Sequence, residues 1–306
     1  MRQEPALYWV QLEQTKIPAP GSPPCYFAAW EKRHYRRLRS NLDRYRFLTG
    51  RFLVRQGLSL IHGGCCRPEQ WRFLRTRYGR PVPAPACGQG FSFSLSYSGH
   101  LVVAALARDC LVGVDIERIC GHDQDISAAL SGQEQQHLSR IEPGERALAS
   151  LRTWTIKEAV AKLVGLGLSL DLTTFSVLPG SGSLQVLFGP DFPFSCKRLR
   201  ISSSRIACDN GSYVLSLATA IGVEPRKRKK RKKGITVPPV RIPVRETVLD
   251  FDNVQIQGGS GYVDIAAGNR PGIWHSLSPR LPRGNGFCSA IKISGETGCI
   301  PPASSF

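Results

Sequence analysis

Residues 112–117 read VGVDIE, an alternation of apolar and acidic residues that is typical of a half-buried β-strand. Successive side chains of a strand point to opposite faces, so Asp115 and Glu117 are expected on one face, about 6.6 Å apart. Val114 and Ile116 are then expected in the core. Two carboxylates on one face favour a bound cation, although a solvent-exposed strand face without a ligand would show the same alternation.

A helix is expected 37 residues beyond this strand, where residues 154–162 read WTIKEAVAK. Positions i and i+4 share one face of a helix, so Glu158 and Lys162 are expected to lie together, one turn beyond Trp154. The apolar positions of the stretch form a separate stripe. Glu158 can therefore supply a third carboxylate. Alternatively, it forms only an exposed ion pair with Lys162, worth about 0.3 to 0.5 kcal/mol.

The two stretches together bring carboxylates and lysines to one place. Carboxylates that leave coordination sites open for water and phosphate oxygens are the ligands that Mg²⁺ prefers. Lysines close by can neutralise the negative charge of a phosphate group. The residues therefore predict a Mg²⁺ centre that handles a phosphate or a pyrophosphate.

The order and spacing of the two stretches resemble those of the Sfp-type 4'-phosphopantetheinyl transferases. The pattern of that family is G-[IV]-D-[IV]-E followed by W-[ST]-x-K-E-[AS]-x-x-K. The resemblance covers residues 7–222 and includes YGRP at 78–81, FSLSYSG at 93–99, the basic residues 31–55 and a last strand at 213–218.

The resemblance implies an α/β (α+β) fold of two similar halves, related by a pseudo-twofold axis, with the active site at their junction. We assign residues 1–108 to the N-terminal half and residues 109–222 to the C-terminal half, which carries both motifs. Apolar residues recur near helical spacing in residues 30–56, which predicts one long basic helix there. The S-x-x-E pattern at 131–134 predicts a helix start with Glu134 as its cap.

The same resemblance implies Mg²⁺-dependent transfer of 4'-phosphopantetheine from coenzyme A to a serine of an acyl or peptidyl carrier protein. Such modified carriers serve fatty-acid, polyketide or nonribosomal-peptide assembly. The implied metal ligands are Asp115, Glu117 and Glu158, with Mn²⁺ as an alternative to Mg²⁺. Glu158 is also the implied general base, because a serine hydroxyl needs a base within hydrogen-bond reach. Lys162 is the other catalytic residue and neutralises charge as the pyrophosphate breaks.

A larger set of residues is expected to bind coenzyme A. Four basic residues near the N-terminus are candidates for its 3'-phosphate, unless they form only a solvated helix face, and Arg80 is a candidate for its nucleotide part. The full set is Lys32, Arg33, Arg36, Arg37, Arg80, Ser96, Tyr97, Lys157 and Lys162.

One position departs from the family pattern F-N-[IL]-S-H-S, because residues 93–98 read FSLSYS. Tyr97 therefore replaces a histidine that contacts a phosphate of coenzyme A in the family. A tyrosine hydroxyl can donate a hydrogen bond, but it cannot supply the positive charge of an imidazolium. The change is expected to affect the affinity for coenzyme A rather than the type of reaction.

The composition limits the partners and the location of the protein. The chain has 306 residues and a formal net charge of +18, which suits an anionic partner such as coenzyme A, an acidic carrier protein or nucleic acid. Ten cysteines without a C-x-x-C pair are expected to be mostly reduced, buried thiols. No apolar run is long enough to span a bilayer. We therefore expect a cytoplasmic protein without a membrane partner, and we expect a monomer.

Residues 223–306 match no part of the family pattern. Eight consecutive Lys and Arg residues at 226–233 repel one another and cannot form a core. We therefore expect a basic, Gly/Pro-rich tail that is mostly disordered, with short apolar pieces such as residues 248–251 as candidate strands. Nucleic acid is expected to bind only through this tail.

Two other functions remain open from the residues alone. Carboxylates in a D-x-E pattern, with a further Glu and Lys, also serve metal-dependent nucleases. The basic run is compatible with a non-catalytic nucleic-acid-binding protein, although the rest of the chain has no recognisable nucleic-acid motif. Modification of an apo carrier protein in the presence of coenzyme A and Mg²⁺ would distinguish the three functions.

Overall fold

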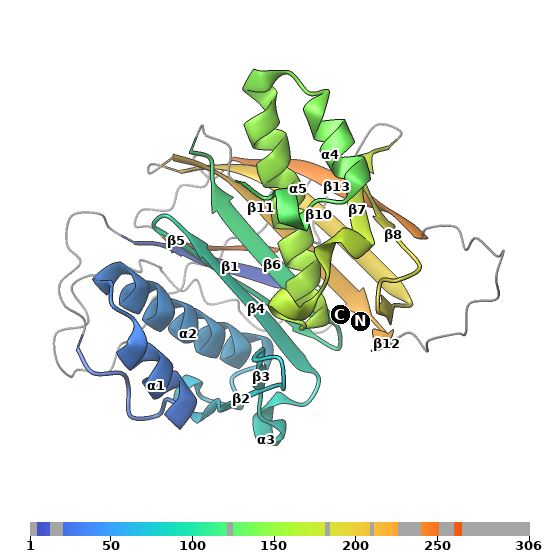
Figure 1. Cartoon of the computed structure of the whole chain (residues 1–306). Helices are drawn as coiled ribbons and strands as arrows, with labels where there is room; N and C mark the ends of the chain where they lie inside the picture. Colours follow the sequence, from blue (N-terminus) through green and yellow to red (C-terminus); the bar gives the residue numbers. More distant parts are fainter. Residues whose placement is uncertain are drawn as a thin grey trace, which may run out of the picture.

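The computed structural model describes residues 5–12, 21–120, 125–180, 184–208, 211–225, 240–250 and 260–264, the last two ranges by their backbone alone. These residues form two main sheets, and one long helix covers each sheet (Figure 1). The mixed α/β fold expected from the sequence is confirmed. The pseudo-twofold relation between the halves stays a prediction.

The first sheet has four strands in the order β14-β1-β5-β4, three of them from residues 1–108 and β14 from residues 260–264. Its strands are β1 (Ala6–Gln11), β4 (Phe91–Ser98), β5 (Leu101–Arg108) and β14 (Ser260–Asp264). Helix α2 (Asn41–Ile61) packs on this sheet, and α1 (Ala29–Arg37) lies beside α2. The smaller elements are η1 (Pro68–Gln70), β2 (Phe73–Arg75), β3 (Pro81–Pro83) and α3 (Pro85–Gly88).

The second sheet has six strands in the order β6-β11-β10-β13-β8-β7, five of them from residues 109–222 and β13 from residues 240–250. Its strands are β6 (Leu111–Arg118), β7 (Phe175–Pro179), β8 (Leu184–Phe188), β10 (Arg198–Cys208), β11 (Gly211–Ile221) and β13 (Val240–Asp250). Helices α4 (Gly132–Ser139) and α5 (Pro143–Val164) accompany it. The smaller elements are η2 (Ser127–Ala129), η3 (Gly167–Ser169), η4 (Leu172–Thr174), β9 (Phe194–Ser195) and β12 (Glu224–Pro225).

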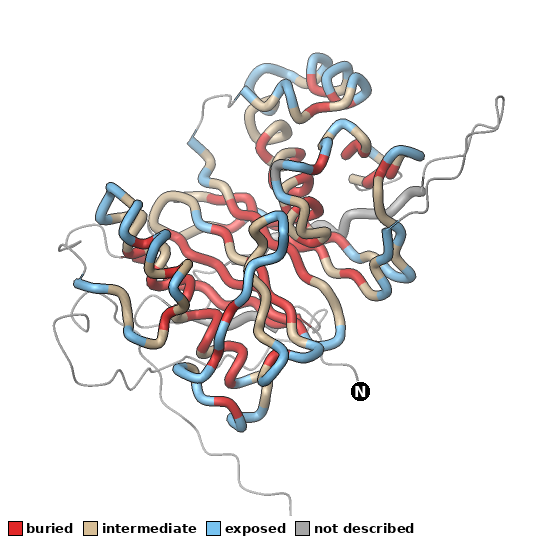
Figure 2. Tube along the Cα trace, turned by 60° about the horizontal axis from the view of Figure 1, so that its bottom comes forward, coloured by how far each residue is buried: buried red, intermediate tan, exposed pale blue. Residues whose placement is uncertain are grey.

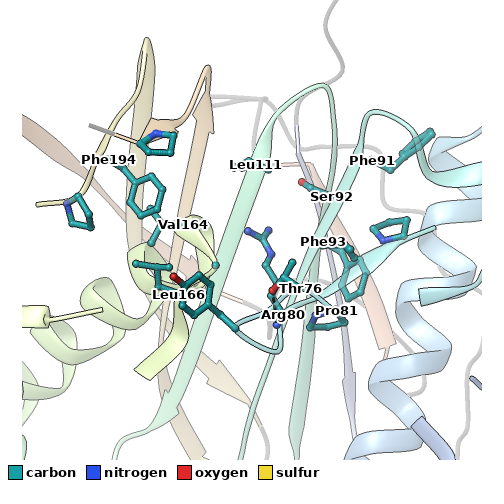
Figure 3. Close-up of a pocket in the computed structure, with 16 residues that line it drawn as sticks. Thr76, Arg80, Pro81, Phe91, Ser92, Phe93, Leu111, Val164, Leu166 and Phe194 are labelled. Atoms are coloured by element: carbon teal, nitrogen blue, oxygen red, sulfur yellow. Dashed lines mark hydrogen bonds between the residues drawn. The ribbon is translucent and has the colours of Figure 1, made fainter. Parts of the chain in front are cut away.

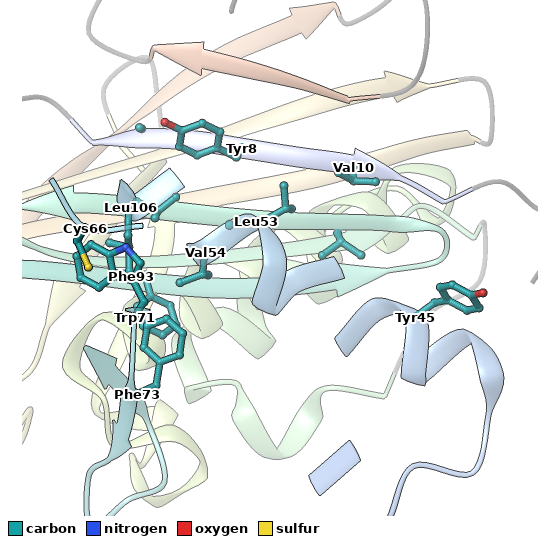
Figure 4. Packing of buried hydrophobic residues seen from close by; sticks show 14 of the residues in the cluster. Tyr8, Val10, Tyr45, Leu53, Val54, Cys66, Trp71, Phe73, Phe93 and Leu106 are labelled. Carbon is teal, nitrogen blue, oxygen red and sulfur yellow. The ribbon is translucent and has the colours of Figure 1, made fainter. Parts of the chain in front are cut away.

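The core follows the alternation of side chains along the strands. Residues at even positions of β1 and β5, such as Tyr8 and Leu106, pack against α2 residues such as Val54 (Figure 4). Residues at odd positions of the same strands pack with Val114 and Ile116 of β6, together with residues of β10 and β11. The buried segments in Figure 2 accordingly follow the strands through the middle of the molecule. The two halves therefore share one apolar layer.

The close packing of α5 on β6 explains the glycine of the VGVDIE stretch. A Cβ atom at Gly113 would lie 2.0 Å from the carbonyl oxygen of Ala159 and 2.5 Å from the nitrogen of Leu163. Any side chain at this position would push α5 away from β6. Helix α5 ends at Gly165, whose φ of 77° lies in the left-handed region that favours glycine.

Two sequence predictions about the fold need correction. Residues 30–56 form two helices rather than one, because the backbone of Leu38 is extended and Ser40 starts α2 by accepting a hydrogen bond from the Asp43 nitrogen. Residues 240–250 and 260–264 are strands rather than parts of a disordered tail. β13 pairs with β8 and β10, and β14 pairs with β1.

The added strands have a simple physical reason, because β1, β8 and β10 present backbone groups that need partners. The sequence VRIPV at 240–244 offers the β-branched residues that strands favour. Residues 224–225 also pair, as β12 with β9. The basic run at 226–233 lies outside the described residues.

Candidate active site

Strand β6 presents Asp115 and Glu117 toward α5, as the alternation predicts. Val114 and Ile116 are fully buried on the other side of the strand. Asp115 is itself only 3% exposed. The alternative of a solvent-exposed strand face is therefore wrong for Asp115.

The two oxygens of the Asp115 carboxylate differ in their hydrogen bonds. The Ser96 hydroxyl donates to Asp115 Oδ1 at 2.8 Å, and Lys162 Nζ donates to the same oxygen at 2.6 Å. Lys162 Nζ also donates to Ser96 Oγ at 2.9 Å. Asp115 Oδ2 is buried and has no hydrogen-bond partner among the described residues. A buried carboxylate oxygen without a partner is costly unless a further ligand satisfies it.

Glu117 accepts hydrogen bonds from both halves of the molecule. Ser98 Oγ of β4 donates to Glu117 Oε2 at 2.8 Å, and the Trp154 side chain of α5 is a second partner. Burial raises the pKa of Glu117 above its ordinary value, and the negative charge of Asp115 acts in the same direction. The two hydrogen bonds and the charge of Lys162 oppose this shift.

Glu158 lies on the face of α5 that points to the same place. Burial is the main cause that raises the pKa of Glu158, and the charges of Asp115 and Glu117 raise it further against the opposing effect of Lys162. The three carboxylates predicted from the sequence therefore interact with one another. The alternative for Glu158, a solvated ion pair with Lys162, does not describe this environment.

The acidic cluster, defined as Asp115, Glu117 and Glu158, has the chemistry of a hard-cation site. Within the described ranges, no three His, Cys, Asp or Glu side chains are already arranged to hold a metal ion, and Lys162 lies against Asp115 instead. The unpartnered Asp115 Oδ2 and two carboxyl groups with raised pKa values nevertheless fit a divalent cation, which would satisfy the oxygen and offset the repulsion.

The structure does not bring Lys157 to the acidic cluster. Lys157 is fully buried, and its ammonium lies 2.8 Å from Glu134 Oε2. It also donates to the carbonyl oxygens of Leu172 at 2.7 Å and Phe175 at 2.8 Å. The expected contact with coenzyme A does not fit this position, because all three donor directions are used inside the protein.

Glu134 takes the capping role that the sequence predicts. It caps α4 at Ser131, and in addition it accepts a hydrogen bond from the Val177 nitrogen at 2.7 Å. Glu134 thus links α4, α5 and β7.

Arg80 lies at the junction of the halves beside a cavity of about 590 Å³ (Figure 3). Its guanidinium donates to the carbonyl oxygens of Leu163 at 2.7 Å and Val112 at 3.3 Å, and burial lowers its pKa to about 10. The cavity is mostly apolar and lies between the loop of Arg80, the starts of β4 and β6, and the end of α5. Its wall includes Tyr78, Phe93 and Leu166.

The four basic residues of α1 lie in a different region. Arg33, Arg36 and Arg37 are exposed, and Lys32 donates to the carbonyl oxygen of Cys25 at 2.8 Å. In Figure 1, α1 lies beside α2 and apart from α5. The structure therefore does not place these residues against the acidic cluster, and their role in binding the 3'-phosphate stays a prediction.

Tyr97 is half exposed near a charged residue that sequence reasoning missed. The guanidinium carbon of Arg46 lies 5.4 Å from the centroid of the Tyr97 ring. Arg46 Nε also donates to the carbonyl oxygen of Gly99 at 2.9 Å, which fixes it beside the end of β4. Arg46 can thus supply the positive charge that Tyr97 lacks. The family motif gives no signal for it, because the two residues meet only in the folded chain.

The region that carries the acidic cluster matches a known protein family. The family model described as 4'-phosphopantetheinyl transferase superfamily matches residues 111–218, which include the whole acidic cluster. The 4'-phosphopantetheinyl transferase psf-1 of Bacillus pumilus is 34% identical over 173 residues, which span 56% of this chain and 72% of the relative. The chain belongs to the 4'-phosphopantetheinyl transferase superfamily.

Another transferase and a solved structure are among the further matches. The 4'-phosphopantetheinyl transferase Sfp of Bacillus subtilis (strain 168) is 31% identical over 153 residues, or 49% of this chain and 66% of the relative. The crystal structure of Thermotoga maritima holo-[acyl-carrier-protein] synthase gives a TM-score of 0.30 at 19% identity, covering 36% of this chain and 62% of that chain. Membership of the 4'-phosphopantetheinyl transferase superfamily makes the protein an enzyme of the transferase class. No described helix is long and apolar enough to cross a membrane.

Proposed function

We propose that this enzyme transfers 4'-phosphopantetheine from coenzyme A to a serine hydroxyl of an acyl or peptidyl carrier protein, in a reaction that depends on Mg²⁺. Family membership supports the transferase over the nuclease and the nucleic-acid-binding alternatives. The arrangement of charged groups at the site supports the dependence on Mg²⁺. Three interacting carboxylates lie beside Lys162, and one buried oxygen of Asp115 has no partner among the described residues.

Asp115, Glu117 and Glu158 would hold the Mg²⁺ ion. The bound ion would neutralise charge on the pyrophosphate oxygens of coenzyme A. Lys162 supplies further positive charge to these oxygens, since its side chain is 28% exposed and therefore accessible to a substrate. Ser96 donates to Asp115 and fixes the direction of this carboxylate.

The proposed reaction forms one bond and breaks another. The serine oxygen of the carrier forms a bond to the phosphorus that carries the pantetheine group. The bond from that phosphorus to the bridging oxygen of the pyrophosphate breaks, and adenosine 3',5'-bisphosphate leaves. Glu158 accepts the proton of the serine hydroxyl.

The cavity beside Arg80 is proposed to receive the nucleotide part of coenzyme A. Its volume of about 590 Å³ falls in the range of small-molecule sites, and its wall includes Val164, two residues beyond Lys162 on α5. The half-exposed ring of Tyr78 is available for contact with a base. Arg80 contributes by shaping the wall of the cavity, because its guanidinium is already bound to two carbonyl oxygens.

Incubation with coenzyme A, Mg²⁺ and an apo carrier protein tests the proposal. We expect the carrier to gain the mass of phosphopantetheine, and we expect chelation of Mg²⁺ to prevent the gain. Asp115→Ala and Glu158→Gln should each lower the rate by about 10² to 10⁴-fold. Glu145→Gln changes an exposed glutamate of the same helix and should have no effect.

Two results would contradict the proposal. If none of the carrier proteins tried is modified, the proposed transfer is excluded. A wild-type rate in Glu158→Gln would exclude the assigned base even if the transfer occurs.

A further inference from the structure

Strands β4 and β6 lie side by side in the same direction, although they belong to different sheets. No backbone ladder joins them among the described residues. Instead, the four serines at alternate positions of β4 form hydrogen bonds with successive parts of β6. These serines, here called the serine stripe, are Ser92, Ser94, Ser96 and Ser98.

The serine stripe binds two different kinds of group. Ser92 donates to the carbonyl oxygen of Cys110 at 2.6 Å, and Ser94 accepts from the Val114 nitrogen at 3.0 Å. These two serines bind backbone groups, Ser94 within β6 and Ser92 at the residue that precedes it. Ser96 and Ser98 instead donate to carboxylates of the acidic cluster, each at 2.8 Å. The first two serines of the stripe thus contact backbone, whereas the last two orient side chains of the acidic cluster.

Ser98 has a fixed orientation. Its oxygen accepts a hydrogen bond from the Arg118 nitrogen at 3.0 Å, and its single proton is given to Glu117 Oε2. A serine hydroxyl has only one proton to donate, so the bond from Arg118 favours one direction for the bond to Glu117. The Trp154 side chain holds Glu117 from α5. Glu117 is therefore held between strand β4 of one half and helix α5 of the other.

We propose that Ser98 and Trp154 are positioning residues that orient Glu117 as a ligand for a divalent cation. This inference rests on the proposed function, which assigns Glu117 to the Mg²⁺ site. Glu117 lies next to two other carboxylates that repel it, so it needs neutral donors to stay turned toward them. Groups that hydrogen-bond to metal ligands typically change metal affinity by about 10- to 100-fold when they are removed.

Binding of Mn²⁺ to the full chain tests this inference, with electron paramagnetic resonance as the measure of free Mn²⁺. Ser98→Ala and Trp154→Phe should each weaken Mn²⁺ binding by about tenfold. Ser98→Thr keeps the hydroxyl and should restore binding to within about twofold of the wild type. Ser94→Ala is the matched control, since it removes a hydroxyl of the same stripe that binds only backbone. It should lower the thermal stability and leave Mn²⁺ affinity unchanged.

Two outcomes would overturn the inference while leaving the proposed function intact. Ser98→Ala could bind Mn²⁺ as tightly as the wild type, or Ser94→Ala could lose as much affinity as Ser98→Ala. A wild-type protein that binds no Mn²⁺ and no Mg²⁺ would instead overturn the metal assignment, and the inference with it.

Discussion

Two lysines of helix α5 form ion pairs that differ in their burial and in their hydrogen bonds. Lys157 pairs with Glu134 at 2.8 Å, and Lys162 pairs with Asp115 at 2.6 Å. The first pair has 0% and 1% of its side-chain surface exposed, against 28% and 4% for the second. Five residues turn a helix by about 140° beyond a full turn, so the two lysines leave α5 in different directions.

The two pairs differ in how many of their polar atoms have a hydrogen-bond partner. The Lys157 ammonium has Glu134 and two carbonyl oxygens, and Glu134 has two backbone nitrogens in addition to Lys157. The Lys162 pair lies beside Glu117 and Glu158, and it leaves Asp115 Oδ2 without a partner in the part of the chain that the structure describes. We call the first pair closed and the second pair open. A closed pair stabilises the fold, whereas an open pair has capacity left for a ligand.

The largest expected effect comes from breaking the closed pair. Lys157→Met leaves the Glu134 carboxylate buried without its counter-charge, and such a loss typically costs about 3 to 5 kcal/mol of unfolding free energy. We expect this loss to be the same with and without Mg²⁺. Lys162→Met should cost less, and added Mg²⁺ should reduce its cost, because a cation can compensate the acidic cluster. Urea denaturation with and without Mg²⁺ measures both.

The double variant Lys157→Met with Glu134→Gln is the control for this prediction. It removes both charges and should recover part of the lost stability. The distinction between closed and open pairs would fail if Lys162→Met were the more destabilised protein and Mg²⁺ did not help it.

A smaller effect on stability is expected from Glu158→Gln, which removes one negative charge beside the open pair. The pKa of Glu158 is raised, so the folded state binds its proton more tightly than the unfolded state does. The stabilising contribution of this group is therefore present below its unfolded pKa of about 4.5 and is lost as pH rises through the higher folded value. Glu158→Gln should then make the metal-free protein more stable than the wild type at pH 7, while it lowers the transfer rate.

Thermal unfolding of the metal-free proteins at several pH values checks this trade-off. The gap between Glu158→Gln and the wild type should close as pH falls toward about 4.5. If Glu158→Gln were less stable than the wild type at pH 7, Glu158 would stabilise the fold. Repulsion within the acidic cluster would then not destabilise it. Glu145→Gln, on the exposed side of α5, serves as the reference variant.

Local sequence patterns predicted that the acidic cluster and Lys162 meet at one site, but they predicted neither the pairing of Lys162 with Asp115 nor the closed pair. The alternation around Asp115 and the helical spacing of Glu158 and Lys162 each depend on a few neighbouring residues, and both patterns are confirmed by the structure. Lys157 occupies the same motif as Lys162. Its partners come from α4 and from the segment at 172–175, so its burial depends on tertiary packing that no local pattern contains.

The register of β4 against β6 could not be predicted for the same reason. The alternating serines at 92–98 were visible in the sequence, but only the fold shows that they face β6. Residues 240–264 gave a similar difficulty. Their strands pair with β1, β8 and β10, which are distant in the sequence, so composition alone suggested a tail.

The smallest expected effect concerns Tyr97, whose ring contacts Arg46 and not the acidic cluster. If the Tyr97 hydroxyl binds a phosphate of coenzyme A, Tyr97→Phe should weaken binding by about 0.5 to 1.5 kcal/mol, the net value of one hydrogen bond. The KM for coenzyme A should rise and kcat should change little, because such a contact is equal in the ground and transition states. Steady-state kinetics at varied coenzyme A concentration measures both constants.

Arg46 sharpens this last test. The charge of Arg46 already helps to lower the pKa of nearby His100, after burial as the main cause, so a histidine at position 97 should also be neutral at pH 7. Tyr97→His should therefore bind coenzyme A better than Tyr97→Phe only at acidic pH, below about 6.5, where an imidazole beside Arg46 begins to carry charge. An unchanged KM in Tyr97→Phe would assign the phosphate contact to Arg46 rather than to the hydroxyl, and Arg46→Gln should then raise KM more than either variant of Tyr97.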